Sequence, residues 1–486
     1  MRNAGVLLHI SSLPSPYGIG TLGKSARQFV DFLKKAGVRW WQMLPVGPTG
    51  YGDSPYQSFS SFAGNPYFID LDTLIEGGWL TAQEAAAPFW GDDPARVDYG
   101  AIWQGRRKVF EKVYERFSRS EPGDFEDFCE DHAFWLEQYA DFMALKDRFG
   151  GSRDDFPKEF RVRGDIRGVE GAGFYKMQQY FFYKQFDALR RYAHEQGVLL
   201  IGDLPIYASA DSSDVWAHPE VFRLNDEHRP AAVAGCPPDG FAPDGQRWGN
   251  PLYDWDALRQ SDYEWWHRRL CHQGTLFDRI RIDHFRGFES FFVIDAAAPT
   301  ARDGHWEKGP GDAFFARLKE RGGKFDIIAE DLGIVTEEVR EMLEKSGYPG
   351  MKVLQFAFDH NDESFYLPYL CPHNAVMYTG THDNDTVLGW LASLSPEDKA
   401  YAVDFMRLND AEGYVWGVIK TALVSPADTA VLTMQDILGK DGSCRMNTPG
   451  VPAGNWKWRM TERELAGAPA DKLHALMRTY HRESNK

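Results

Sequence analysis

Short apolar runs recur along the whole chain, and each has the length of a buried β-strand. The first is Val6-Leu7-Leu8-His9-Ile10, and the segment from Ala26 to Ala36 behind it has the spacing of an amphipathic helix. Seven similar runs follow, over residues 38–45, 198–205, 279–285, 326–331, 352–358, 375–383 and 430–436. Most are separated by segments of helical spacing, so the pattern is one of alternating strands and helices.

Eight strands alternating with helices predict an α/β protein built as a closed, parallel (β/α)8 TIM barrel. An open, doubly wound parallel sheet is the alternative, and it would also carry its site at the carboxyl ends of the strands. No glycine-rich dinucleotide fingerprint follows any of the runs, which disfavours that alternative.

The chain has 486 residues, whereas such a barrel needs about 250, so large insertions are expected. We predict one catalytic barrel over residues 1–486, with inserted subdomains at about 75–193 and about 225–265. The first is mainly helical, and its aromatic stripes favour core packing. The second is rich in Pro, Gly and Asp and is predicted to be a long loop without regular structure, which is typical of a functional segment. The stripes comprise residues 174–189 and the set Trp103, Val109, Phe110, Val113, Tyr114 and Phe117.

The formal net charge of −17 and the pI of about 5.3 argue against nucleic acid or an anionic membrane surface as a partner. No apolar run is long enough to span a membrane, and the N-terminal apolar run is too short for a signal peptide. The five cysteines are widely spaced, which is typical of reduced thiols. A cytoplasmic protein is therefore expected.

Most of the predicted strands end in polar or ionisable residues, and in a barrel these ends converge on one face. Arg281 and Asp283 lie two residues apart and so share one face of their strand, where the guanidinium favours the ionised carboxylate. Glu330 follows Ile327-Ile328-Ala329, and apolar surroundings raise the pKa of a carboxyl group. The strand-end residues are His9, Gln42, Asp203, Asp283, His284, Glu330, Asp331, Gln355, His382, Asp383, Gln435 and Asp436.

One ionised and one protonated carboxyl group are what glycoside cleavage with retention requires. Asp283 is then the candidate nucleophile and Glu330 the candidate acid and base. Asp383 is a third carboxylate, which with His284 and His382 would position sugar hydroxyl groups beside the cleaved bond.

Each of these residues also has a structural interpretation. Asp283 would form a buried ion pair, Glu330 would cap a helix that begins near residue 336, and Asp383 would be a turn residue. Two other function classes also fit: a sugar-binding protein without catalysis, and a metal-dependent barrel hydrolase. The metal ligands in the second case would be His9, Asp203, His382 and Asp383.

Motifs along nearly the whole chain resemble the 4-α-glucanotransferase family, also called amylomaltases or disproportionating enzymes. They include Gly52-Asp53-Ser54-Pro55-Tyr56-Gln57, Gly202-Asp203-Leu204-Pro205, the run from Arg281 to Gly287, Ala329-Glu330-Asp331-Leu332-Gly333, Thr381-His382-Asp383-Asn384 and Asn455-Trp456-Lys457-Trp458-Arg459. The middle of the helical insertion, about residues 85 to 165, carries the weakest match.

The resemblance implies transfer of α-1,4-glucan segments from one maltooligosaccharide to the 4-hydroxyl of another sugar, through a covalent glycosyl-Asp intermediate. It implies Asp283 as the nucleophile, Glu330 as the general acid and base, and Asp383 as the transition-state stabiliser. No cofactor and no metal are expected, and the chain would be a monomer or a homodimer. The implied substrate-binding residues are Tyr56, Asp203, Arg281, His284, His382, Trp248 and Asn455.

By the same resemblance, the segment from Gly235 to Gly249 is a flexible loop over the acceptor side of the active site. Together with Phe241 and Trp248, it would hold the acceptor sugar and keep water out, which favours transfer over hydrolysis.

Overall fold

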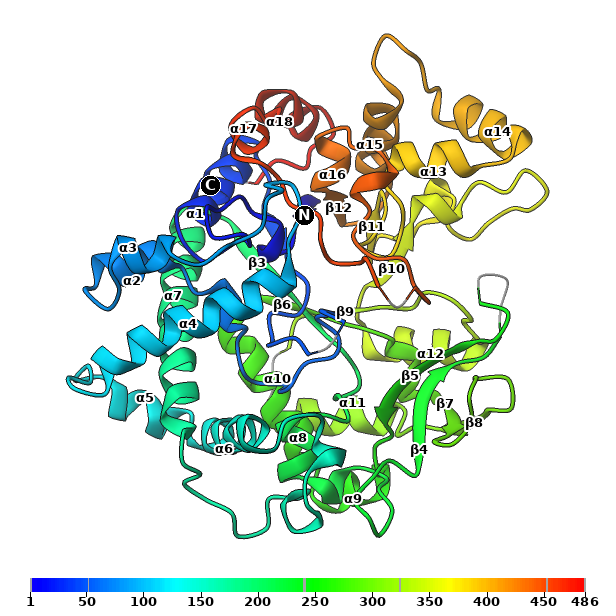
Figure 1. Ribbon diagram of the computed structural model, residues 1–486. Coiled ribbons are helices and arrows are strands. Elements are labelled where there is room, and N and C mark those ends of the chain that lie inside the picture. Colours follow the sequence, from blue (N-terminus) through cyan, green and yellow to red (C-terminus); the bar gives the residue numbers. More distant parts are fainter. Residues whose placement is uncertain (1, 51, 239–241, 323–324, 452, 485–486) are drawn as a thin grey trace.

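Eight short parallel strands form the barrel in a computed structural model that describes residues 2–50, 52–238, 242–322, 325–451 and 453–484 (Figure 1). The strands follow one another around the barrel in chain order, and Ala329 N donates to Pro349 O (2.9 Å) where the last pair meets. This order confirms the predicted (β/α)8 barrel and excludes the doubly wound sheet. The strands are β1 (Asn3–Leu7), β2 (Trp40–Gln42), β3 (Leu199–Leu204), β6 (Arg279–Ile282), β9 (Ile327–Ala329), β10 (Gly350–Val353), β11 (Ala375–Tyr378) and β12 (Thr429–Thr433).

Each predicted apolar run contains or overlaps one barrel strand. These strands are almost fully buried because helices cover the outside of the barrel and side chains fill the inside. The covering helices and those that follow the later strands are α1 (Lys24–Lys35), α8 (Ser213–Ala217), α9 (Trp255–Gln260), α10 (Glu264–Leu276), α11 (Asp312–Glu320), α12 (Glu337–Ser346), α13 (Val387–Ser393), α14 (Pro396–Met406), α15 (Tyr414–Val424), α16 (Met434–Ile437), α17 (Glu462–Ala466) and α18 (Ala470–Thr479).

Between β2 and β3 the chain forms a group of helices on one side of the barrel (Figure 1). The aromatic stripes predicted there are buried in α4 and α7 with two exceptions: Tyr114 is half-buried and Trp103 is 67% exposed. At this end of α4 the buried face centres on Ile102 and Gly105. Because an α-helix turns by about 100° per residue, Trp103 points away from this buried face. The helices are α2 (Leu71–Glu76), α3 (Ala82–Ala86), α4 (Tyr99–Phe117), α5 (Phe125–Asp131), α6 (Ala133–Phe149) and α7 (Ala172–Glu195).

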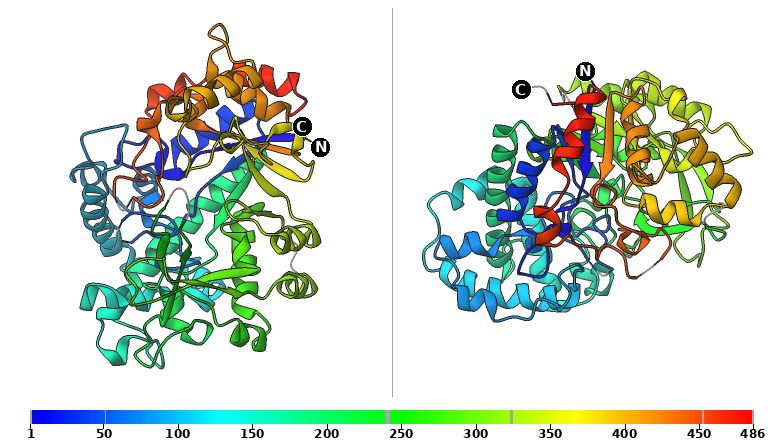
Figure 2. Two further views of the ribbon diagram at one scale, coloured as in Figure 1. Left: turned by 90° about the vertical axis from the view of Figure 1, so that its right-hand side faces the viewer. Right: turned by 90° about the horizontal axis from the view of Figure 1, so that it is seen from above.

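The segment predicted as an irregular loop at about 225–265 is instead partly a β-sheet, so that prediction is wrong. β4 (Ala232–Cys236) and β5 (Gln246–Pro251) pair antiparallel and join β7 (Ser290–Asp295) and β8 (His305–Lys308) in the order β5-β4-β7-β8. This accessory sheet lies beside the barrel (Figures 1 and 2). The sheet depends on pairing between β4 and β7, which are far apart in the chain.

The two ends of the chain meet at the barrel, as both views of Figure 2 show. Arg482 follows α18, is fully buried, and donates to the backbone carbonyl groups of the chain end and of the α15–β12 connection. The acceptors are the oxygens of Leu423 (2.7 Å), Asn3 (2.9 Å), Asp428 (3.3 Å), Ser425 (3.0 Å) and Ala427 (2.8 Å). One guanidinium therefore donates to five backbone carbonyl groups, three of which also accept from Asn3 N or from Arg2.

Among the described residues, no helix has both the length and the apolar character needed to cross a membrane.

Replacing Arg482 with Met should lower the free energy of unfolding by about 3 kcal/mol, because five backbone carbonyl groups then lose a charged donor. The measurement is urea denaturation followed by tryptophan fluorescence. Arg478→Met, at an exposed position of the same C-terminal segment, is the control and should change stability by less than about 0.5 kcal/mol. Equal stabilities of the two variants would contradict the role given to Arg482.

Candidate active site

The register of three neighbouring strands brings the predicted site residues together. Asp203 on β3 lies directly opposite Arg281 on β6, and Ile282 lies opposite Ala329 on β9. Since Asp283 and Glu330 follow Ile282 and Ala329, the two carboxyl groups emerge side by side at the carboxyl end of the barrel.

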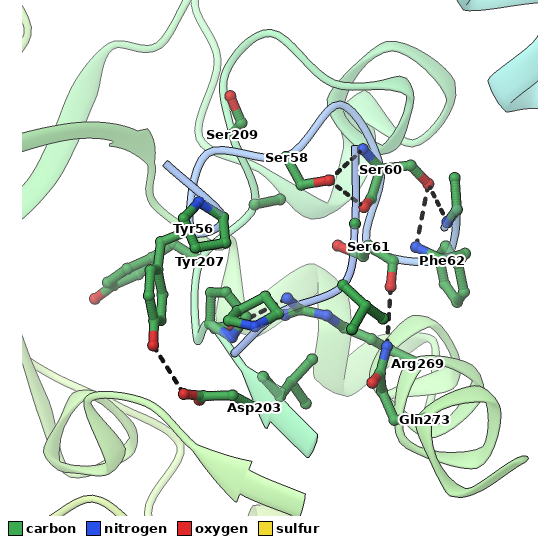
Figure 3. Close-up of a pocket in the computed structure, with 18 of the residues that line it drawn as sticks. Tyr56, Ser58, Ser60, Ser61, Phe62, Asp203, Tyr207, Ser209, Arg269 and Gln273 are labelled. Atoms are coloured by element: carbon green, nitrogen blue, oxygen red, sulfur yellow. Dashed lines mark hydrogen bonds between the residues drawn. The ribbon is translucent and has the colours of Figure 1, made fainter. Parts of the chain in front are cut away.

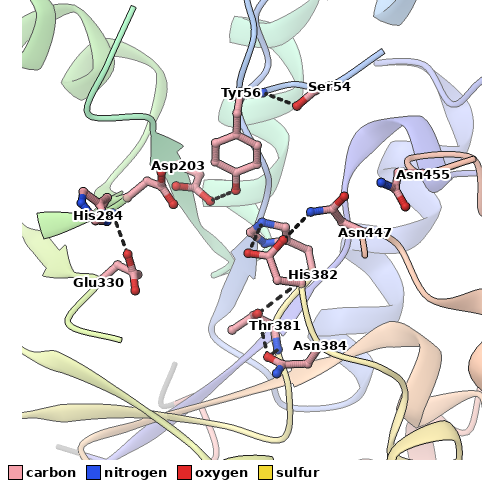
Figure 4. Close-up of polar contacts among 12 residues, drawn as sticks. Ser54, Tyr56, Asp203, His284, Glu330, Thr381, His382, Asn384, Asn447 and Asn455 are labelled. Atoms are coloured by element: carbon pink, nitrogen blue, oxygen red, sulfur yellow. Dashed lines mark hydrogen bonds and ion pairs between the residues drawn. The ribbon is translucent and has the colours of Figure 1, made fainter. Parts of the chain in front are cut away.

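Arg281 lies at the centre of this group with 3% of its side chain exposed. Its Nη1 donates to both carboxylate oxygens of Asp203, at 2.7 and 2.8 Å, and to Asp283 Oδ1 at 3.2 Å. The Tyr56 hydroxyl donates to Asp203 Oδ2 at 2.8 Å (Figure 4). Asp203 is therefore the main partner of the guanidinium, and Asp283 receives a weaker contact.

The Asp283 side chain remains 28% exposed, so it is accessible from the open end of the barrel. Burial of the Asp283 carboxyl group nevertheless raises its pKa well above the usual range, although the charge of Arg281 lowers this pKa. The carboxylates of Glu330, Asp203 and Asp383 raise this pKa further. Arg281 therefore favours the ionised form of Asp283, as predicted, but burial and the neighbouring acids outweigh this effect.

Glu330 is held by the backbone next to the candidate nucleophile. His284 N donates to Glu330 Oε2 at 2.6 Å (Figure 4). Leu332 N donates to Glu330 Oε1 at 2.9 Å. Burial raises the pKa of the Glu330 carboxyl group, as predicted, while Arg281 and these two N–H groups oppose the rise. Glu330 does not cap the following helix, because Thr336 is the N-cap of α12.

His284 has a left-handed backbone, with φ of 51°, which is uncommon for a residue other than glycine. This conformation turns its N–H toward Glu330. The imidazole ring packs edge-on against Trp248 of the accessory sheet, with ring centroids 4.9 Å apart. The accessory sheet thus contacts the same turn that follows Asp283.

Asp383 is positioned by a segment that lies more than 60 residues later in the chain. Asn447 Nδ2 donates to Asp383 Oδ1 at 2.6 Å, and Arg445 donates to the Asp383 carbonyl oxygen at 2.5 Å. His382 Nε2 lies 3.3 Å from Asp383 Oδ2, and burial lowers the pKa of His382, which favours its neutral form. The sequence reasoning missed Asn447 and Arg445, because both lie in a segment without strand or helix periodicity.

Aromatic rings form one side of the site. Tyr56 stacks on His382 with ring centroids 5.2 Å apart, and Trp456 contacts both rings, at 6.0 and 5.9 Å. Behind Tyr56 lies a pocket between the segment 45–63, the end of β3 and α10 (Figure 3). Gln273 of α10 donates to the Ser61 carbonyl at 3.4 Å across this pocket and so supports the segment that carries Tyr56.

Asn455, unlike the other predicted binding residues, forms its hydrogen bonds with the backbone of its own loop. Its amide exchanges hydrogen bonds with the backbone of Thr448 and donates to the Val451 carbonyl, at 2.9 to 3.3 Å. It therefore braces the loop that follows Asn447 (Figure 4). The binding role of Asn455 stays a prediction, and Phe241, predicted to cover the acceptor, lies outside the described residues.

The four candidate metal ligands do not form one group with metal-compatible spacing among the described residues, although His382 and Asp383 are in contact. In the part of the chain that the structure describes, the one group with metal-compatible spacing is Asp359, His360 and Asp398, which is none of the predicted ligands. His9 is buried, and burial followed by the charge of His382 lowers its pKa to about 3. The arrangement of the site is one of paired carboxylates and neutral imidazoles.

Comparison with known proteins gives one consistent result. A family model described as 4-alpha-glucanotransferase matches residues 8–465. The chain is 45% identical to the 4-alpha-glucanotransferase of Streptococcus pneumoniae, over 99% of this chain and 97% of that protein. It is 45% identical to that of Thermus thermophilus, over 98% of each. The amylomaltase of Streptococcus agalactiae, solved in complex with acarbose, superimposes with a TM-score of 0.96 at 40% identity, covering 99% of this chain and 100% of that one.

The His284 imidazole should stay neutral from pH 8 down to pH 4, because burial followed by the charge of Arg286 lowers its pKa to about 3. In spectra of the protein with 13C-labelled histidine, its ring signal should not shift over this range. His360 is the internal control, since its hydrogen bond to Asp398 raises its pKa and it should titrate fully. A His284 signal that titrates near pH 6.5 would contradict the buried, neutral ring.

Proposed function

The chain belongs to the 4-alpha-glucanotransferase family, and from this premise we propose that Asp283, Glu330 and Asp383 carry out its transfer reaction. The observation that supports the assignment is the backbone link between two of them: the N–H of His284, next to Asp283, donates to the Glu330 carboxylate. This link keeps a nucleophile and a proton donor beside one reaction centre, as a retaining mechanism needs.

The first step forms a glycosyl-enzyme. An oxygen of Asp283 attacks the anomeric carbon of the donor glucan, the bond to the leaving 4-oxygen breaks, and Glu330 transfers its proton to that oxygen. Asp283 must be ionised and Glu330 protonated at this moment. The contact of Asp283 with Arg281 favours that distribution of the proton within the pair.

The second step releases the product. The Glu330 carboxylate takes the proton from the 4-hydroxyl of an acceptor sugar, whose oxygen attacks the anomeric carbon and breaks the ester to Asp283. Two inversions restore the α-configuration. The products are a new α-1,4-glucan and the regenerated carboxyl pair.

Asp383 stabilises the positive charge that develops on the sugar ring between these states. Its carboxylate is aimed by Asn447 and lies beside the neutral imidazole of His382. A fixed negative charge that needs no reorganisation is effective in such a step. We assign the sugar hydroxyl contacts to Tyr56, Asp203, Arg281, His284, His382 and Trp248.

The substrates that follow are α-1,4-glucans and maltooligosaccharides, and neutral chains of this kind are compatible with the acidic net charge of −17. We further propose that the whole chain acts as one catalytic barrel in the cytoplasm. Its inserted parts at about 75–193 and 225–265 then shape the access to the site.

Asp283→Asn and Glu330→Gln should each lower transfer from maltotriose by about 10⁴-fold, because one removes the nucleophile and the other the proton donor. Chromatography should show glucose and longer oligosaccharides from the wild type and almost none from the variants. Mass spectrometry after reaction with a fluorinated, slowly released glycosyl donor should place the adduct on the peptide with Asp283. An adduct on another residue, or an Asp283→Asn variant with wild-type activity, would overturn the assignment.

Asn447→Ala should lower kcat for maltotriose by about 10- to 100-fold, because the Asp383 carboxylate loses the group that orients it. Asn455→Ala is the matched comparison, an amide in the same loop whose hydrogen bonds serve the loop backbone. It should change KM more than kcat. The reverse pattern would show that Asn455, and not Asn447, serves the reaction centre.

A further inference from the structure

Arg286 lies three residues after Asp283, in the short 3-10 helix η6 (Phe285–Phe288). Its side chain is buried, with 5% exposure, and none of the reaction steps above uses it. Its guanidinium lies over the ring of Trp306 on β8, 3.8 Å from the ring centroid. It also donates to Ser290 Oγ on β7 at 3.0 Å, so the accessory sheet holds it from two strands.

The remaining contact of Arg286 leads to the acid and base residue. Its Nη1 donates at 2.5 Å to the carbonyl oxygen of Ile334, four residues after Glu330. The short segment between them contains Leu332, whose N–H donates to Glu330 Oε1. Arg286 therefore fixes the far end of the loop that carries one of the two backbone donors to Glu330. The other donor, His284 N, belongs to the turn that leads into η6.

We propose that Arg286 is a positioning residue for Glu330, acting through the Ile334 carbonyl and the Leu332 N–H to hold the acid and base carboxyl group in place. The inference rests on the proposed role of Glu330. It also gives the contact between the accessory sheet and the barrel a function. The sheet supports the Arg286 guanidinium, and this guanidinium fixes the loop after β9.

The charged and titratable groups around Glu330 determine what loss of this support does. Arg281 and Asp283 face it from β6, Asp331 follows it in the chain, and the Tyr366 phenol faces it from the segment after β10. None of these contacts depends on Ile334. Loosening the loop therefore removes chiefly the Leu332 N–H, a donor that lowers the pKa of Glu330.

Loss of the Leu332 N–H should shift the pH dependence of kcat in one direction. Glu330 must be protonated to assist the leaving oxygen, so the alkaline limb of kcat against pH reports its pKa. Without the Leu332 N–H the charged form loses a donor and the pKa rises, so the limb moves to higher pH. A role in folding alone would lower thermal stability without moving the limb.

The test compares Arg286→Met and Arg286→Lys with Arg106→Met. Arg106 is a matched control: it is 1% exposed, donates to the Ile69 carbonyl at 2.7 Å, and lies 5.5 Å from the ring of Trp90 in the helical insertion. Arg286→Met should lower kcat for maltotriose by about 10- to 100-fold at nearly unchanged KM, with the alkaline limb shifted upward. Arg286→Lys should recover part of kcat and of the limb position, since an ammonium still reaches one carbonyl. Arg106→Met should keep the wild-type pH profile.

A second donor separates this inference from the proposed function. A maltosyl fluoride releases fluoride, which needs little proton assistance, so the first burst of fluoride should be nearly normal in Arg286→Met and in Glu330→Gln. Glu330→Gln that is as slow on the fluoride as on maltotriose would overturn the role of Glu330 itself. The role of Arg286 alone would be overturned if Glu330→Gln reacts normally with the fluoride and one of two further results is found. Either the alkaline limb of kcat does not move in Arg286→Met and Arg286→Lys, or it moves equally in Arg106→Met. If Arg286→Met does not fold, the limb position of Arg286→Lys decides.

Discussion

The active site depends on one guanidinium that compensates several acids in a buried place. Arg281 binds both oxygens of Asp203 and one oxygen of Asp283, while Glu330 lies within the range of its charge. A buried carboxylate without a partner costs several kcal/mol, so this group of acids needs the arginine to exist at all. The compensation is incomplete, which is why the pKa of Asp283 and that of Glu330 both lie above their usual values. Incomplete compensation favours retention of a proton by the pair, which the proposed acid catalysis requires.

Backbone hydrogen bonds beyond the ends of the strands fix the backbone of Asp283 and Glu330. Asp283 N donates to Leu204 O, Glu330 N donates to Ile282 O, and Phe285 N donates to Glu330 O, all near 3 Å. The pairing of β3, β6 and β9 therefore continues into Asp283 and Glu330. The left-handed conformation of His284 costs about 1 kcal/mol, and the surrounding pairing holds it in place. The strained turn at His284 is a rigid support for Glu330, whereas a free loop would leave the Glu330 carboxyl group mobile.

The sequence was sufficient to predict the eight strands and the position of Asp283, Glu330 and Asp383 beyond the ends of strands, because short apolar runs with polar ends are local features. The pairing register was not visible there, so the division of the Arg281 charge between Asp203 and Asp283 could not be predicted. The accessory sheet was missed because β4 and β5 are short and contain Gly or Pro, and because β4 pairs with β7, which lies about 55 residues beyond it. Asn447 and Asn455 have the same side chain in one irregular segment, and only coordinates distinguish the amide that reaches Asp383 from the amide that braces the loop.

The distribution of the site along the chain sets how it can form. The site residues belong to segments that span most of the sequence. The contacts Tyr56–Asp203, Arg281–Asp203, His284–Glu330 and Asn447–Asp383 each join residues at least 46 positions apart. Bringing such segments together has an entropic cost that no single contact in the site repays. Burial of the barrel core offsets this entropic cost, since closure of the barrel buries the strands and fixes the strand ends at the same time. The polar site can therefore remain imperfectly compensated, because its geometry is imposed by the apolar core beneath it and not by the ion pairs within it.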